Sequence, residues 1–238
     1  MIKKPLNQNA KYAQEIIDEV EPYFIYSKKP INRFKVDEDK FKNTKQNKNK
    51  LLQNLRKKIN SIENCNLKLN CKNLIMGDGD INSSLMLIGG SPGKAEDESG
   101  LSFQGEIGTL LVKMLLAINI KREKIYSTYV SNFRPPEDRK LTSQEIKRYS
   151  VFLKEHISII NPKIVVLMGS TALEAITGLS RISFERGKWK EILINDKTFP
   201  LITTFSPSYL IRFPENKKFS WEDLKSIKKK IQEFKIKI

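Results

Sequence analysis

The sequence predicts an α/β fold in three layers, α/β/α, with a central, mainly parallel sheet of four strands between two layers of helices. From about residue 72, short apolar runs alternate with amphipathic segments, and loops rich in glycine, proline or acidic residues separate them. At 39% hydrophobic residues, a chain of 238 residues can bury a substantial core. We therefore expect an N-terminal helix and lysine-rich linker in residues 1–50 and one α/β domain in residues 51–238.

The N-terminal region has two dissimilar parts. Residues 9–24 carry apolar residues at helical spacing, whereas the stretch from Ser27 to Lys50 is polar, lysine-rich and aperiodic, which is typical of a linker. An amphipathic helix from about Lys48 to Ile62 then leads into a loop that holds Cys65 and Cys71. The compact domain is expected to begin there.

Strands and helices alternate through the rest of the chain. The helix that follows Thr142 opens with the pattern TSQE, a capping box in which the threonine hydroxyl and the Glu145 carboxylate satisfy exposed N–H groups. The expected strands are residues 85–89, 124–132, 163–169 and 199–205, and the other expected helices are residues 107–118, 170–177 and a last one from about Ser220.

Three loops that follow these strands have unusual compositions. They are GGSPGKAEDESGLSFQG (89–105), NFRPPEDR (132–139) and SPSYLIR (206–212). In open parallel sheets the binding crevice lies at the carboxyl ends of the strands, so these loops are the candidate site. The first loop resembles neither a Walker motif nor a dinucleotide fingerprint, and taken alone it is either a ligand loop or a structural turn.

Composition excludes several classes of protein. One histidine, His156, rules out multi-histidine metal sites, and it is expected to be an ordinary helix residue. Two cysteines cannot alone hold a four-cysteine site, and we expect them to be reduced thiols in a cytoplasmic protein. No apolar window is long enough to span a membrane and no signal peptide is evident, so a soluble chain without a membrane partner is expected.

The net charge of +16 is concentrated in two flanks. Residues 28–58 hold 12 Lys and Arg against 3 acidic residues, and residues 217–238 hold 8 against 3. This distribution indicates a polyanionic partner, most simply nucleic acid. The alternative is codon bias, because 34 of the 43 basic residues are lysines in a chain rich in Lys, Ile and Asn.

Five ordered motifs resemble the uracil-DNA glycosylases, in particular family four. The motifs are the loop of residues 89–105, FRPPEDR, PKIVVLMGSTA, RGKW and TTFSPSYLIR, and the resemblance covers about residues 60–235. The family's pattern is GEAPGxxEDxxGxPFxG, NxxxCRPPxNR, PxxxxxLG, RGxW and HPSYLLR. The resemblance implies a DNA-binding fold that flips a nucleotide out of the stack and hydrolyses its base-to-sugar bond.

The resemblance also assigns site residues. Phe103 matches the aromatic that stacks on uracil, and Asp97 matches a carboxylate that holds the loop or a water. The run from Pro207 to Arg212 resembles a loop that inserts an apolar wedge into DNA and contacts phosphates. The expected set is catalytic Asp97, Ser206 and Gly90, base-binding Phe103, Gly89, Ser91, Tyr129 and Asn132, and DNA-binding Pro207, Ser208, Tyr209, Leu210 and Arg212.

Departures from the family pattern concentrate at the catalytic positions. Gly90 replaces the family's water-handling acid, Ser206 replaces its histidine, and Tyr129 aligns with its base-reading asparagine, for which Asn132 is a substitute only if the strand slips. Losing an oxyanion donor costs about 10² to 10³ in rate. Weak or altered excision of uracil or another damaged base is therefore expected.

The iron–sulphur cluster that the resemblance implies lacks its ligands. The cysteine positions align with Ile62, Cys65, Phe133 and either Tyr149 or Ser150, so one ligand of four remains. We expect no metal and no cofactor, with aromatic packing in the cluster's place. Cys65 and Cys71 together form only a weak metal candidate.

Three functions remain open on the sequence alone. The first is a divergent glycosylase that acts as a monomer on DNA. The second is a catalytically inactive relative that binds DNA or a base. The third, a small-molecule nucleotide or phosphate module, explains neither RPPEDR nor SPSYLIR.

Overall fold

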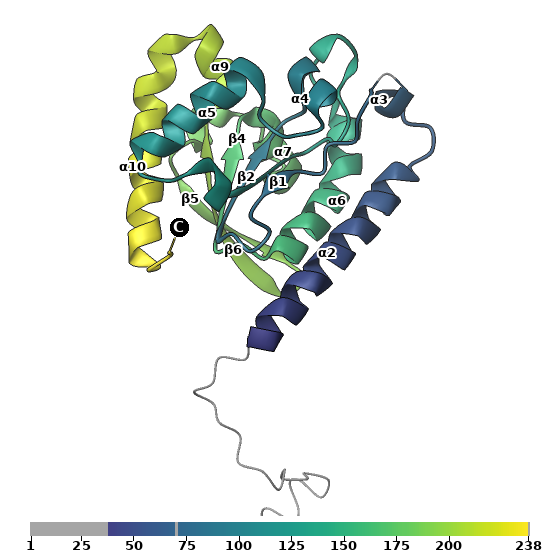
Figure 1. Ribbon diagram of the computed structural model, residues 1–238. Coiled ribbons are helices and arrows are strands. Elements are labelled where there is room, and N and C mark those ends of the chain that lie inside the picture. The colour runs from purple at the N-terminus through teal and green to yellow at the C-terminus, as the bar shows by residue number, and fades with distance from the viewer. Residues whose placement is uncertain (1–37, 70, 238) are drawn as a thin grey trace, which may run out of the picture. The chain divides into compact units, whose positions relative to one another are not determined.

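The computed structural model describes residues 38–69 and 71–237 and has the predicted three-layer α/β/α architecture (Figure 1). Its sheet has six strands in the order β1-β3-β2-β4-β6-β5. The four central strands run parallel, and all four coincide with predicted strands. They are β2 (Leu85–Gly89), β3 (Tyr126–Tyr129), β4 (Ile164–Met168) and β6 (Lys197–Thr204).

Two antiparallel edge strands were missed from the sequence. β1 (Asp78–Gly79) pairs with β3, and β5 (Trp189–Ile194) pairs with β6. Between β5 and β6 only Asn195 and Asp196 intervene, with φ of 46° and 60°, as in a two-residue hairpin turn. That Asn-Asp pair between two apolar runs was the signal for β5, whereas β1 is too short to show a period.

Side-chain alternation along the central strands produces the two cores. Leu85 and Leu87 point to one face of β2, while Met86 and Ile88 point to the other. Strand β4 does the same, so both faces of the sheet are apolar. The sheet therefore has to be covered by helices on both sides.

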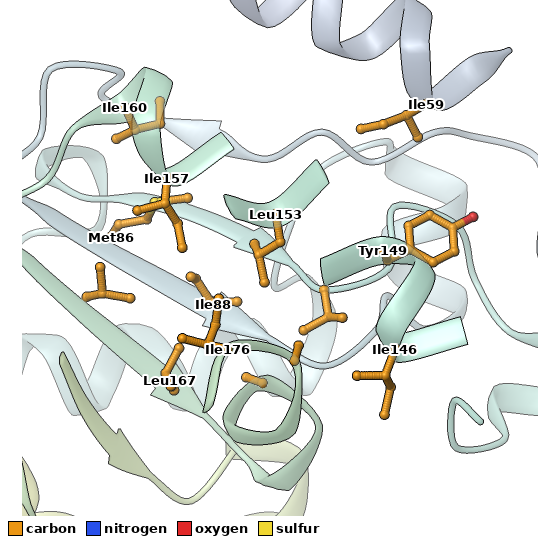
Figure 2. Packing of buried hydrophobic residues seen from close by; sticks show 14 of the residues in the cluster. Ile59, Met86, Ile88, Ile146, Tyr149, Leu153, Ile157, Ile160, Leu167 and Ile176 are labelled. Atoms are coloured by element: carbon orange, nitrogen blue, oxygen red, sulfur yellow. The ribbon is translucent and has the colours of Figure 1, made fainter. Parts of the chain in front are cut away.

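Each face has its own helices. Helices α5 (Gly105–Ala117) and α10 (Lys217–Glu233) cover the Leu87 face. Helices α2 (Glu38–Asn60), α6 (Ser143–Ile160) and α7 (Ser170–Thr177) cover the Met86 face. Figure 2 shows Leu153 and Ile157 of α6 gathered with Met86 and Ile88 of β2 in this second core.

Helix α2 corrects the predicted linker. It begins at Glu38 and runs through Lys50, so the part of the linker that lies in the described residues is helical. Its Leu55 and Ile59 are buried in the core, and the Lys48 ammonium donates to the carbonyl oxygens of Ile81 and Ile160 at 3.2 and 2.8 Å. Lys, Glu and Gln are good helix formers, and this outweighs the missing apolar period before Leu51.

The predicted helix at residues 9–24 lies outside the described residues, and the division at residue 50 stays a prediction. No helix within residues 38–69 and 71–237 is both long and apolar enough to span a membrane. The remaining elements are short. They are α3 (Asn66–Leu69), α4 (Lys94–Ser99), α8 (Ile182–Glu185), α9 (Pro207–Arg212) and the 3₁₀ turns η1 (Arg122–Lys124), η2 (Pro136–Asp138) and η3 (Pro214–Asn216).

The capping box of α6 is confirmed. The Glu145 N–H donates to the Thr142 hydroxyl at 3.2 Å, and the Thr142 N–H donates to the Glu145 carboxylate at 2.8 Å. His156, farther along the helix, is fully enclosed and shares a 2.9 Å hydrogen bond with the Tyr126 hydroxyl. The histidine lies within a helix, as predicted, and the structure adds that it is buried.

The burial of His156 predicts an acid-sensitive fold. Desolvation lowers its pKa from 6.5 to about 4. The imidazole of His156 is therefore protonated at a higher pH in the unfolded chain than in the folded protein. The free energy of unfolding loses nothing from this group above pH 6.5 and falls by about 3 kcal/mol as the pH drops toward 4. Between pH 7 and 4.5, urea unfolding of His156→Gln should show a shallower loss than the wild type. Equal losses would contradict this.

Candidate functional site

A cavity of about 750 Å³ opens at the carboxyl ends of the four parallel strands. All three predicted loops contribute to its lining, and so do the residues that directly follow β4. Figure 1 shows α4 and α9 at this end of the sheet. Of the expected site residues, those that line the cavity are Gly89, Gly90, Ser91, Phe103, Tyr129, Ser206, Pro207, Ser208, Tyr209 and Arg212.

Gly89 lets two aromatic rings approach the end of β2. A Cβ atom at this position would lie 2.7 Å from two ring carbons of Tyr129 and 2.9 Å from Cζ of Phe103. These separations are shorter than any normal carbon contact. Gly89, predicted to bind the base, is therefore approached closely by the protein's own rings.

Glu96 ties the glycine loop together. Its side chain is 2% exposed and accepts three hydrogen bonds, from the N–H of Gly93 at 2.9 Å, the N–H of Gln104 at 3.0 Å and the hydroxyl of Tyr129 at 3.1 Å. A buried carboxylate needs such partners, because its desolvation is otherwise very costly. Glu96 is thus a structural anchor between α4, the Phe103 turn and β3.

Phe103 occupies a strained and buried position. Its φ is +52°, a left-handed conformation that an aromatic residue rarely adopts. Its ring is 5% exposed and stacks on the Tyr129 ring, with centroids 4.8 Å apart and planes 28° apart. The Phe103 N–H donates to the Tyr129 hydroxyl at 2.9 Å. The two residues form one unit.

The strand register decides between Tyr129 and Asn132. Gly89 of β2 pairs with Tyr129 of β3, so Tyr129 is the residue at the strand end. Asn132 is buried, its side-chain amide donates to the Ile75 carbonyl at 2.8 Å, and it is absent from the cavity lining. The slip that would have brought Asn132 into the site does not occur, so its predicted base contact is not supported.

Asp97 lies behind the loop and not in the cavity. Its Oδ1 accepts the N–H groups of Lys72 and Asn73 at 2.8 and 3.0 Å, and its carbonyl accepts the Asn73 amide at 2.7 Å. Of the two expected roles, holding the loop and holding a water, these contacts support the first.

The SPSYLIR motif forms helix α9. The Ser206 hydroxyl caps this helix by accepting the Tyr209 N–H at 3.3 Å, and it bonds the Ser208 hydroxyl at 3.0 Å. Leu210 is 1% exposed and belongs to the core, which corrects the expected wedge: helical spacing turns Leu210 inward. Ile211 and the exposed Arg212 face the cavity instead.

The FRPPEDR loop forms another part of the rim. Arg134 makes two hydrogen bonds to Asp138, at 2.7 and 3.0 Å, and Arg139 makes two to Glu145 at the start of α6, at 2.9 and 2.7 Å. Arg139 lowers the pKa of Glu145 to about 2. These pairs hold Arg139 and Lys140 at the cavity.

The RGKW motif contributes a support that sequence reasoning did not assign. The guanidinium of Arg186 pairs with the buried Asp223 of α10 and lies 5.6 Å from the centroid of the Phe205 ring. Burial raises the pKa of Asp223, although Arg186 and the Thr204 hydroxyl oppose this. Arg186 thereby fixes the end of β6 just before Ser206. Its place in the resembled pattern was the available signal.

The residues present do not fit an iron–sulphur cluster. Phe133 and Tyr149 pack edge to face with centroids 6.5 Å apart, and the Tyr149 hydroxyl lies 3.1 Å from the Cys65 sulphur. Ile62 belongs to the same core. Cys65, Phe133 and Tyr149 thus meet in space, and the four aligned positions supply a single thiol. Within residues 38–69 and 71–237, no three His, Cys, Asp or Glu side chains could together hold a metal ion. Function without a cofactor stays a prediction.

The contact at Gly89 predicts a large effect of one methyl group. Gly89→Ala should destabilise the protein by about 1–3 kcal/mol through overpacking against Tyr129 and Phe103. Chemical denaturation measures this. In a Tyr129→Ala background the same substitution should cost less, because two of the three clashing atoms are gone. Equal costs in both backgrounds would show that the Tyr129 ring does not meet Gly89.

Comparisons with known proteins agree with this geometry. Residues 76–225 match the model of the Uracil DNA glycosylase superfamily. The type-4 uracil-DNA glycosylase of Thermotoga maritima is 33% identical over 75% of this chain and 93% of its own length. Those of Archaeoglobus fulgidus and Sulfurisphaera tokodaii are 29% and 31% identical, each over 74% of this chain and over 91% and 83% of their own lengths. The chain therefore belongs to the uracil-DNA glycosylase superfamily.

Proposed function

We propose that the protein binds DNA and hydrolyses the N-glycosidic bond of a flipped nucleotide that carries uracil or another damaged base, with weak or altered activity. The observation that carries this proposal is the cavity at the strand ends, in a chain that belongs to the uracil-DNA glycosylase superfamily. We further expect a monomer that acts in the cytoplasm in base-excision repair.

The charges around the cavity suit a DNA backbone. Lys94, Arg139, Lys140 and Arg212 line it. Helices α5 and α7 also begin there, and a helix start attracts anions through its unpaired N–H groups and its dipole. Phosphate contacts of this kind position a protein on DNA without reading its sequence.

The catalytic inventory of the cavity is small. Gly90 offers a backbone N–H but no acid, and Ser206 offers one neutral hydroxyl that already caps α9. Of the carboxylates that line the cavity, Glu96 is fully engaged and Asp138 is paired with Arg134. Glu106, in the first turn of α5, has no hydrogen bond or ion pair within the described residues. It is the best placed group to orient a water.

A second candidate is a catalytically inactive DNA- or base-binding relative. The specific observation in its favour is the engagement of Glu96 and Asp97, since these two of the loop's three acidic residues hold backbone N–H groups. In this case the cavity would bind DNA without breaking a bond.

Single-turnover assays separate the two candidates. With enzyme in excess over duplexes that contain uracil, hypoxanthine or xanthine, the first candidate predicts slow formation of abasic product from at least one of them. Glu106→Gln should slow that release by about 10² if Glu106 orients water, whereas Glu123→Gln, outside the cavity, should not. No product from any duplex over hours would leave the inactive relative.

Salt dependence tests the DNA interface. Replacing Arg212 with Gln should weaken duplex binding evenly across sequences and reduce the slope of log K against log salt by about 1, as expected for one lost phosphate contact. Fluorescence anisotropy at several salt concentrations measures the slope. Lys229→Gln, an exposed charge of α10 that does not line the cavity, is the control. Equal effects of both changes would indicate diffuse attraction only.

A further inference from the structure

We propose that the Tyr129 ring occupies the base-stacking position against Phe103, so that the site prefers an extrahelical nucleotide without a base. The inference rests on the DNA binding of the proposed function and favours its second candidate, the catalytically inactive relative, because a base that cannot stack on Phe103 is not positioned for excision. It names the preferred ligand class as abasic DNA.

The Tyr129 ring lies against Phe103 as a stacked base would. A flipped base that stacks on an aromatic ring lies parallel to it, at a distance typical of stacked rings. The Tyr129 ring already lies in that relation to Phe103, with centroids 4.8 Å apart and planes 28° apart. Tyr129 also stands at the strand end, where the resembled pattern has an asparagine that reads the base edge.

Both rings are buried. Phe103 and Tyr129 are 5% and 4% exposed, and both belong to the core that faces α5 and α10. A base can stack on Phe103 only if one face of that ring is open. Because Phe103 is only 5% exposed and Tyr129 covers one face of its ring, a base can stack on that face only if Tyr129 leaves.

Hydrogen bonds hold the ring in place. The Tyr129 hydroxyl accepts from the Phe103 N–H and donates to Glu96. On either side of Phe103, the Ser102 N–H and hydroxyl both donate to Asp78 at 2.9 Å, and the Gln104 N–H donates to Glu96. Burial raises the pKa of Tyr129, so the hydroxyl keeps its proton and remains a donor. Removing the ring would break both of its bonds inside the core.

The cavity in front of the rings still suits a sugar and its phosphates. Thr171, Ser206 and Ser208 line it with hydroxyl groups, and Lys94 and Arg212 add positive charge. An abasic deoxyribose needs these polar contacts and no stacking surface. A uracil nucleotide would bring a ring that cannot stack on the face of Phe103 that Tyr129 covers.

The experiment compares duplexes and side chains in parallel. Fluorescence anisotropy would measure the full-length wild type, Tyr129→Phe, Tyr129→Ala and Tyr129→Asn on duplexes with a central tetrahydrofuran abasic analogue, deoxyuridine or thymidine. Wild type and Tyr129→Phe should bind the abasic duplex tightest and should not prefer deoxyuridine to thymidine. Tyr129→Ala and Tyr129→Asn should bind the deoxyuridine duplex about tenfold more tightly than the abasic duplex, because a base that stacks on Phe103 adds about that much affinity.

Free uracil gives a readout that needs neither DNA nor bond cleavage. Titration monitored by NMR should show no binding of millimolar uracil to the wild type and binding to the Ala or Asn variant. Uracil binding to the wild type with shifts at Phe103 would overturn the inference even if no variant folds. It would also be overturned by folded variants that gain no uracil binding. Failure of the proposed DNA binding appears separately, as no measurable affinity of the wild type for any of the three duplexes.

Discussion

The buried carboxylate of Glu96 is the interaction on which the site depends. It accepts hydrogen bonds from Gly93 in the glycine loop, from Gln104 beyond the Phe103 turn, and from Tyr129 at the end of β3. Three segments that are separate in sequence thus share one charge that is out of contact with water. Losing one charged hydrogen bond of this kind typically costs about 1.5–3 kcal/mol. The same hydrogen bonds that order the loop occupy the Glu96 carboxylate, so that it is not free to orient a water.

The fold could be predicted because its signals are local. Apolar runs fixed the four parallel strands, and the TSQE cap placed α6 at the correct residue. The position of the site followed, since parallel strands deliver their loops to one edge. The extension of α2 to Glu38 was missed because residues 38–50 show no apolar period, although their lysines are good helix formers.

The site was harder to predict, because its chemistry depends on side-chain direction. The motif match assigned roles to Tyr129, Leu210 and Asp97, but no pattern shows that Tyr129 stacks on Phe103 or that Leu210 turns into the core. These outcomes depend on register and helical phase, which a one-residue change would reverse. The chain has kept the architecture of its superfamily while its own side chains fill the cluster position and the stacking position.

A crystal structure on a duplex that carries 2′-fluoro-deoxyuridine, an analogue that resists hydrolysis, tests the central claim most directly. The stacked Phe103–Tyr129 pair should persist, with the Tyr129 hydroxyl still bonded to Glu96 and the uracil outside the Phe103 contact. Uracil stacked on Phe103 with Tyr129 swung away would contradict the account.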